Sequence, residues 1–190
     1  MRYSHIFLMA LLVMLFLVLE GKAADITCNT AKKDEHYTEL NWDKLMPPGW
    51  NPAKAFDSLN LDELDDNDPR VAKAMKKLEK MWDEAPTNPA LRGKVIKISG
   101  FVASLDFTGK TELKEFLLVP YFGACIHVPP PPANQIIHVI LAKPRQGIRS
   151  MDTVTVYGKL AIEKTETEMG RSGYSMKADA VEPYVEKKME

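Results

Sequence analysis

The segment from Val119 to Gln135, VPYFGACIHVPPPPANQ, contains residues that could bind a metal or act as a nucleophile. One residue separates Cys125 from His127, so in an extended strand both side chains would point to the same side. A thiolate and an imidazole are good ligands for zinc or copper. The proline run that follows lacks amide donors and has a fixed φ, so it cannot join the interior of a sheet. We therefore predict a stiff, exposed segment that carries the functional surface.

A metal site would need more ligands than this pair supplies. Zinc takes four protein ligands in structural sites, or three when one position stays open. His138 is the third candidate, although it alternates with Ile136 and Ile140 on an apolar face, where a lone histidine is more often a hydrogen-bonded core residue. The predicted metal ligands are therefore Cys125, His127 and His138, with zinc or copper as the cofactor. Such an incomplete site would suit delivery of a metal better than tight storage.

The same segment also fits an adaptor that binds no metal. A proline run is a preformed polyproline surface on which a partner protein can dock, and neighbouring aromatic side chains would add an exposed anchor. In this hypothesis Cys125 is a small buried hydrophobe. The partner-binding residues would be Tyr121, Phe122, Pro129, Pro130, Pro131, Pro132, Asn134 and Gln135.

Thiol catalysis is a third hypothesis, and the least favoured. Cys125 could share a proton with His127, which would lower the pKa of the thiol. A third group would have to orient the histidine, and Asn134 is the one nearby candidate. Redox exchange would need a second cysteine, for which Cys28 is available. In an oxidising compartment Cys28 and Cys125 could instead form a disulfide, so this alternative stays open.

Residues 1–23 are predicted to be a secretory signal peptide. Arg2 provides a basic start, and the apolar run Ile6–Leu19 is shorter than the roughly 20 residues that span a bilayer. The small residues Gly21 and Ala23 suit a cleavage site. We expect a periplasmic protein with no stable membrane insertion after cleavage. The formal net charge of −1 gives no basis for binding nucleic acid.

The remaining chain has the length of one domain. We expect an irregular segment at 24–68, a helix followed by a β domain at 69–180, and a polar tail at 181–190. Asp68 before Pro69 is a helix start, since an acidic N-cap and a proline at the first position favour one. Four apolar residues at helical spacing extend the helix to Asp83: Val71, Met75, Leu78 and Trp82. We interpret Met75 and Met81 as core residues and not as thioether ligands.

The second half of the chain is predicted to consist of five short strands. Their ranges are Lys94–Leu105, Leu113–Val119, Gln135–Leu141, Thr153–Ile162 and Ser172–Ala180. Gly100 and Gly158 lie inside two of them, where a glycine often marks a bulge or a bend. This pattern predicts a mainly β (α+β) fold with one N-terminal helix and a small OB-like Greek-key barrel of about five strands. Such barrels usually bind a ligand.

The sequence GACIHVPPPPANQ, with RGKVIKISGFVASLDF before it and VTVYGKL after it, resembles a family of exported bacterial proteins catalogued as a domain of unknown function. The upstream stretches NWDKLMPPGW and WDEAPTNPALRGK are also similar, so the resemblance covers roughly Asn41 to Ile162. It implies a small periplasmic protein, some relatives of which are encoded beside ABC-type transporter components regulated by zinc supply. It thus implies a role in envelope metal handling, or service to a membrane transporter or another periplasmic protein. No enzymatic activity comes with it.

Overall fold

The computed structural model describes residues 36–51, 68–105, 112–125 and 130–186. The predicted signal peptide, Cys28, His127 and Pro129 lie outside this described part. The chain divides into two units, Met1–Thr38 and Glu39–Glu190, and every feature discussed below belongs to the second. Within the described residues, no helix has the length and apolar character needed to cross a membrane.

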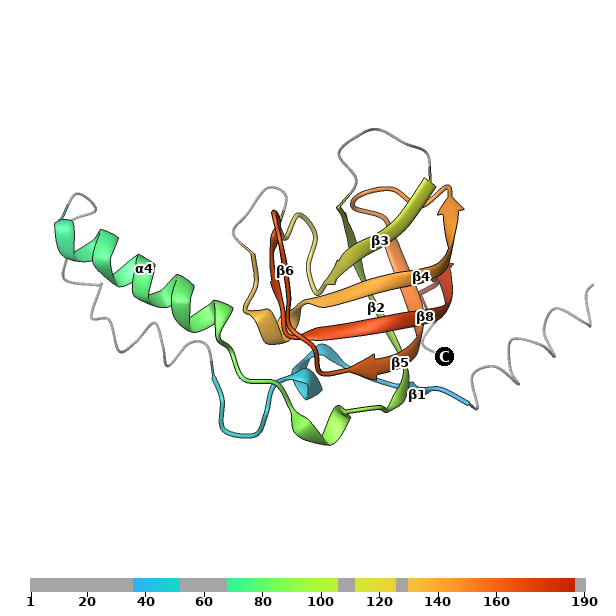
Figure 1. Cartoon of the computed structure of the whole chain (residues 1–190), viewed down its shortest axis with the longest axis horizontal. Coiled ribbons are helices and arrows are strands. Elements are labelled where there is room, and N and C mark those ends of the chain that lie inside the picture. Colours follow the sequence, from blue (N-terminus) through green and yellow to red (C-terminus); the bar gives the residue numbers. More distant parts are fainter. Residues whose placement is uncertain (1–35, 52–67, 106–111, 126–129, 187–190) are drawn as a thin grey trace, which may run out of the picture. The chain divides into compact units, whose positions relative to one another are not determined.

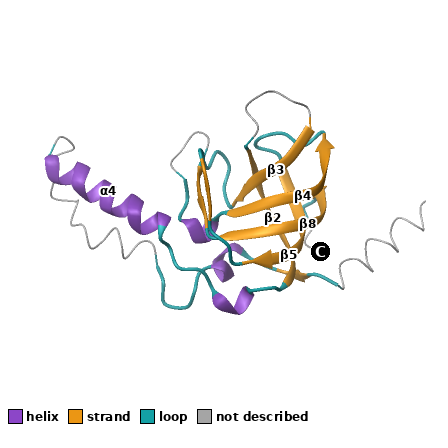
Figure 2. Ribbon diagram, viewed as in Figure 1, coloured by secondary structure: helices purple, strands orange, loops and turns teal. Residues whose placement is uncertain are grey.

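Five long strands close into a barrel (Figures 1 and 2). They are β2 (Val95–Ser104), β3 (Glu112–Val119), β4 (Ile137–Gln146), β5 (Thr153–Ala161) and β8 (Tyr174–Pro183). The strands follow the order β2-β3-β4-β8-β5, and β5 pairs back onto β2 to close the sheet. β4 and β8 run parallel, whereas the other neighbours are antiparallel. The prediction of a mainly β fold with a small five-stranded barrel is confirmed.

Apolar side chains that alternate along these strands fill the interior of the barrel. The largest that are fully buried include Ile96, Ile98, Phe116, Leu118, Ile137, Leu160, Tyr174 and Met176. Period-two alternation puts every second residue of a strand on one face of the sheet, so the remaining residues of β3 and β4 face outward. That outer face carries the candidate site.

The two glycines inside the strands, Gly100 and Gly158, have different structural roles. At Gly158 the register of β5 against β8 shifts, so the bulge predicted there is confirmed. At Gly100 the register of β2 against β5 runs on without a shift, and the glycine instead makes room for the indole of Trp42. Trp42 begins the short helix η1 (Trp42–Leu45), and its Nε1 donates to the carbonyl oxygen of Ser99 at 2.8 Å. Trp42 therefore fastens the N-terminal segment to the barrel.

Helix α4 (Pro69–Asp83) begins and ends at the predicted residues. The side chain of Asp68 caps it by accepting a hydrogen bond from the backbone N–H of Arg70 at 2.8 Å. Leu78 is buried, but Met75 is 47% exposed and Met81 is 37% exposed. The prediction that both methionines are core residues is therefore wrong, because α4 packs against the small hairpin described next and not against the barrel core.

A two-stranded hairpin precedes the last barrel strand, and the sequence pattern did not predict it. It consists of β6 (Thr165–Thr167) and β7 (Gly170–Ser172), which pair antiparallel. The hairpin contacts both α4 and the short helix η4 (Ala133–Gln135), which follows the proline run. It consequently connects the N-terminal helix to the motif-bearing segment.

Candidate functional site

A second apolar cluster lies outside the barrel, under the segment that follows β3. We call it the outer cluster; its buried members are Ala103, Leu117, Val119, Ala124, Ile136 and Met169. These residues come from the outward faces of β2 and β3, from the two ends of the motif segment and from the hairpin. Cys125 is partly buried and packs against this cluster. Cys125 therefore lies on an apolar surface that is separate from the barrel core.

The backbone at Cys125 is unusual. Its φ is 64°, in the left-handed region, where a residue with a Cβ costs roughly 1–2 kcal/mol. Gly123 has a φ of 80° and completes a tight turn after β3. Strained non-glycine residues of this kind gather at functional sites. The strained conformation of Cys125 is thus consistent with a role in function, because it costs stability.

The environment of Cys125 keeps its thiol protonated. Burial raises the pKa of Cys125 from 9.0 to about 11. In the part of the chain that the structure describes, the thiol forms no disulfide. A thiolate is the reactive form of cysteine, so this resting thiol is a poor nucleophile near neutral pH.

We expect the alkylation of Cys125 by iodoacetamide to speed up steadily with pH until about pH 11, because only the thiolate reacts. The measurement uses the Cys28→Ser variant, so that one thiol remains. In denaturant, the rate should be half-maximal near pH 9.0, the ordinary pKa of the thiol, and should level off above it. A plateau below pH 8 in the folded protein would instead indicate a thiolate stabilised by His127.

A cleft with a volume of about 620 Å³ adjoins Cys125. Its walls are α4, the β6–β7 hairpin and the segment that contains Cys125 and the prolines. Its apolar lining consists of Met75, Leu78, Trp82, Cys125, Pro130, Pro131 and Met169. Gly170 lets the hairpin lie against the proline run, since a Cβ there would stand 3.0 Å from the Cβ of Pro130. Concave apolar sites with a few polar groups are the usual form of ligand pockets.

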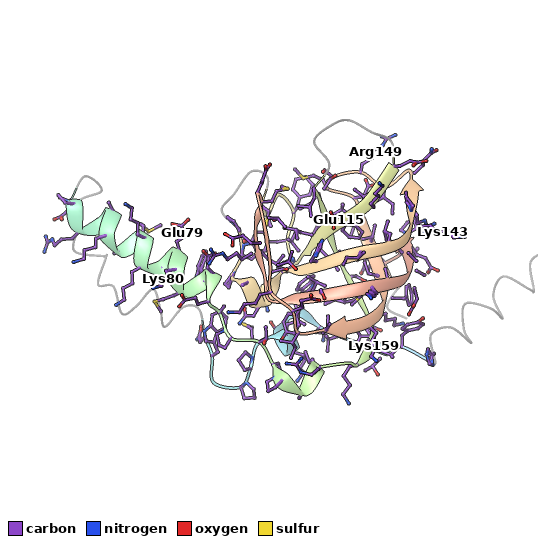
Figure 3. The ribbon with its side chains drawn as sticks, viewed as in Figure 1. Glu79, Lys80, Glu115, Lys143, Arg149 and Lys159 are labelled. Atoms are coloured by element: carbon purple, nitrogen blue, oxygen red, sulfur yellow. The ribbon has the colours of Figure 1, made fainter. Side chains whose placement is uncertain are left out.

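Charged residues also line this cleft. They are Lys76, Glu79, Asp83, Glu166, Glu168 and Arg171, and Figure 3 labels Glu79 on α4. Arg171 lies 3.7 Å from Asp83 of the helix and 2.9 Å from Glu166 of the hairpin, measured between guanidinium nitrogens and carboxylate oxygens. Arg171 therefore connects two walls of the cleft. We call these six charged residues the rim of the cleft. With four carboxylates and two basic side chains, the rim is acidic overall.

His138, the third predicted metal ligand, has another partner. It is 7% exposed on the outward face of β4, and its Nε2 lies 2.9 Å from Oε2 of Glu115 on β3 (Figure 3 labels Glu115). His138 is not among the described residues that line the cleft. Across the described ranges, no group of three or more His, Cys, Asp and Glu side chains is placed to hold a metal ion. The pairing of Cys125 with His127 stays a prediction.

Of the predicted partner-binding residues, the two aromatic ones are exposed. Tyr121 is 42% and Phe122 is 65% exposed. The ring of Phe122 meets that of Phe101 edge to face, with centroids 5.8 Å apart. The contact with Phe101 therefore orients the exposed ring of Phe122, which lies close to Cys125 in the chain.

The proline run is less exposed than predicted. Pro130 is exposed, but Pro131 and Pro132 are buried, so the prediction of a fully exposed proline surface is wrong for these two. Asn134 is also buried, and its Nδ2 donates to the carbonyl oxygen of Pro86 at 2.8 Å. Nε2 of Gln135 donates to the carbonyl oxygen of Trp42 at 3.1 Å. The end of the motif is thus held by the N-terminal segments that wrap the barrel.

The cleft includes residues that the sequence analysis did not assign to a site. Met75 and Trp82 were interpreted as one face of a helix, and Met169 lies in a hairpin with no clear sequence signal. One signal could have indicated these residues: the sequence pattern identified no element against which the apolar face of α4 packs. A helix with an apolar stripe has to bury it against some other element.

Two comparisons with known proteins match this chain to the same family. The family model described as "Protein of unknown function (DUF3299)" matches residues 42–183. The chain is also similar to a DUF3299 family protein from Pseudomonas aeruginosa PAO1, whose crystal structure was determined at 2.45 Å resolution. The TM-score is 0.61 and the identity 34%, over 80% of this chain and 98% of that chain. No curated protein matches this chain significantly.

Proposed function

We propose that this chain, which belongs to the DUF3299 family of proteins of unknown function, is an exported binding and accessory protein that handles metal in the bacterial envelope. The observation that carries the proposal is the cleft that Cys125 lines. It gives a ligand an entrance to a thiol held in a fixed, strained turn. Export is inferred from the predicted signal peptide, from which we expect a periplasmic protein.

Binding fits this site better than catalysis does. The resting thiol is kept protonated by burial, and His138 is engaged by Glu115. A metal ion can nevertheless displace the proton of a thiol, because the metal–thiolate bond replaces the S–H bond. Cys125 and His127 would be the first two ligands, for zinc or copper.

A metal-free adaptor is the second candidate, and the exposed aromatic pair favours it. Tyr121 and Phe122 offer an exposed hydrophobic anchor in the segment before Cys125, of the kind that protein interfaces favour. The partner would be a membrane transporter of the ABC type or another periplasmic protein. The buried Pro131 and Pro132 weaken the original form of this hypothesis, in which the whole proline run binds.

Native mass spectrometry of the mature chain with Zn(II) and with Cu(I) tests the metal proposal. We expect one bound ion, and at least a roughly 10-fold loss of affinity for Cys125→Ser and for His127→Ala. Cys28→Ser is the matched control and should bind like the natural chain. Equal metal uptake by all four proteins would refute metal handling at this site and would favour the adaptor.

A further inference from the structure

We propose that the cleft selects monovalent copper, Cu(I), and binds it through the Cys125 thiolate together with the thioethers of Met75 and Met169. This inference depends on the metal-binding function proposed above, and it names the metal and two further ligands. The sequence pointed to zinc first, with copper as the alternative, and it assigned neither methionine to the site. The argument concerns which sulfur atoms the fold brings to one cleft.

Three sulfur-bearing side chains from three separate elements line the cleft: Met75 from α4, Cys125 from the turn after β3, and Met169 from the hairpin. Met169 and Cys125 also belong to or pack on the outer cluster, so they share one apolar surface. Met75 is 47% exposed, and its unbranched side chain adapts readily to a nearby group. Met81, on the same helix, is not among the described residues that line the cleft.

Softness of the ligands favours copper over zinc at such a site. Thiolates bind both Cu(I) and zinc, but thioethers are not among the usual ligands of zinc, so the two methionines favour Cu(I). The exposure of Met75 leaves room for its unbranched side chain to close over a bound ion.

Charge gives a second reason. When Cu(I) binds, Cys125 releases its proton to solvent and a sulfur–copper bond forms, with no change in oxidation state. One thiolate and one Cu(I) make a neutral pair, which suits the apolar lining. Zn(II) with the same ligands would keep a net positive charge, which the carboxylates that line the cleft would have to offset.

The rim of the cleft would help a cation to reach these sulfur atoms. Its four carboxylates, Glu79, Asp83, Glu166 and Glu168, outnumber Lys76 and Arg171. A cleft lined by one sign of charge raises the local concentration of the opposite ion. His138 is left out of this set because it is not among the described residues that line the cleft.

The test measures Cu(I) affinity of the mature chain without oxygen, by competition with bicinchoninate. Met75→Leu and Met169→Leu should each weaken Cu(I) binding roughly 10-fold or more, and the double variant should weaken it further. Leucine nearly conserves the volume of methionine, so the fold should be kept. Met81→Leu is the matched control and should match the natural chain. Zinc should bind more weakly than Cu(I), and its affinity should not change in the methionine variants.

X-ray absorption at the copper edge gives an independent readout, because the number of sulfur neighbours should fall in each Met→Leu variant. If both variants keep the natural Cu(I) affinity while Cys125→Ser and His127→Ala lose it, this inference fails and metal handling stands. If Cys125→Ser binds metal like the natural chain, both proposals fail. Tighter binding of zinc than of Cu(I) would also overturn the choice of metal.

Discussion

Replacing Gly158 with alanine is expected to destabilise the barrel by about 3 kcal/mol or more. A Cβ at this position would overlap the carbonyl oxygen of Lys177 and stand 3.2 Å from the Cα of Ala178. Both neighbours are backbone atoms of β8, so they cannot turn aside as the end of a side chain would. The bulge that lets β5 and β8 come this close would have to open. Urea unfolding followed by circular dichroism measures the change.

Gly147→Ala provides the matched control for this prediction. Gly147 has a φ of 83°, but a Cβ there would meet no atom within 4 Å. Its replacement should therefore cost only the left-handed conformation, about 1 to 2 kcal/mol. A loss for Gly158→Ala no larger than that for Gly147→Ala would mean that the close approach of β8 does not require a glycine at 158.

Tyr174→Phe should destabilise the fold by about 2 to 4 kcal/mol, although it removes a single oxygen. The hydroxyl of Tyr174 donates to the carbonyl oxygen of Leu45 at 2.6 Å and accepts from the backbone N–H of Asn88 at 2.6 Å. The tyrosine is fully buried at the base of the barrel. Its loss would leave a buried carbonyl and an N–H without partners, and each such group costs about 1 to 3 kcal/mol.

The second expectation for Tyr174→Phe concerns where the loss appears. The hydroxyl connects η1 with the turn before η3 (Pro89–Leu91), so amide hydrogen exchange should rise around residues 42–46 and 87–91. Tyr184→Phe is the control, because Tyr184 is 47% exposed and should change stability by less than about 0.5 kcal/mol. Unchanged exchange in both segments would show that the hydroxyl does not hold them.

The sequence was sufficient for the elements with a clear period. Alternation along Thr153–Ile162 predicted β5 to within one residue, because one face of that strand must enter the core. Asp68 and Pro69 set the start of α4, since capping depends on adjacent residues alone. β4 is longer than predicted and continues through Pro144 to Gln146, where its side chains are largely exposed and the apolar alternation has ended.

The candidate site was only partly predictable. The segment around Cys125 stood out by its residue types, and the exposed aromatic pair was predicted from its neighbourhood. The burial of Pro131 and Pro132 was not, because it depends on the hairpin that packs beside them. The same holds for His138, whose partner Glu115 lies on the neighbouring strand and becomes adjacent only through strand register.

The sequence by itself therefore determined the five barrel strands, helix α4 and the segment that marks this protein, since each depends on the spacing of residues close together in the chain. Tertiary structure alone decided what surrounds that segment. It brought α4 and the β6–β7 hairpin to the cleft that Cys125 lines, and it placed two methionines there. It also brought His138 into contact with Glu115. Such contacts join residues far apart in the chain, so they follow from how the elements pack and not from any local pattern.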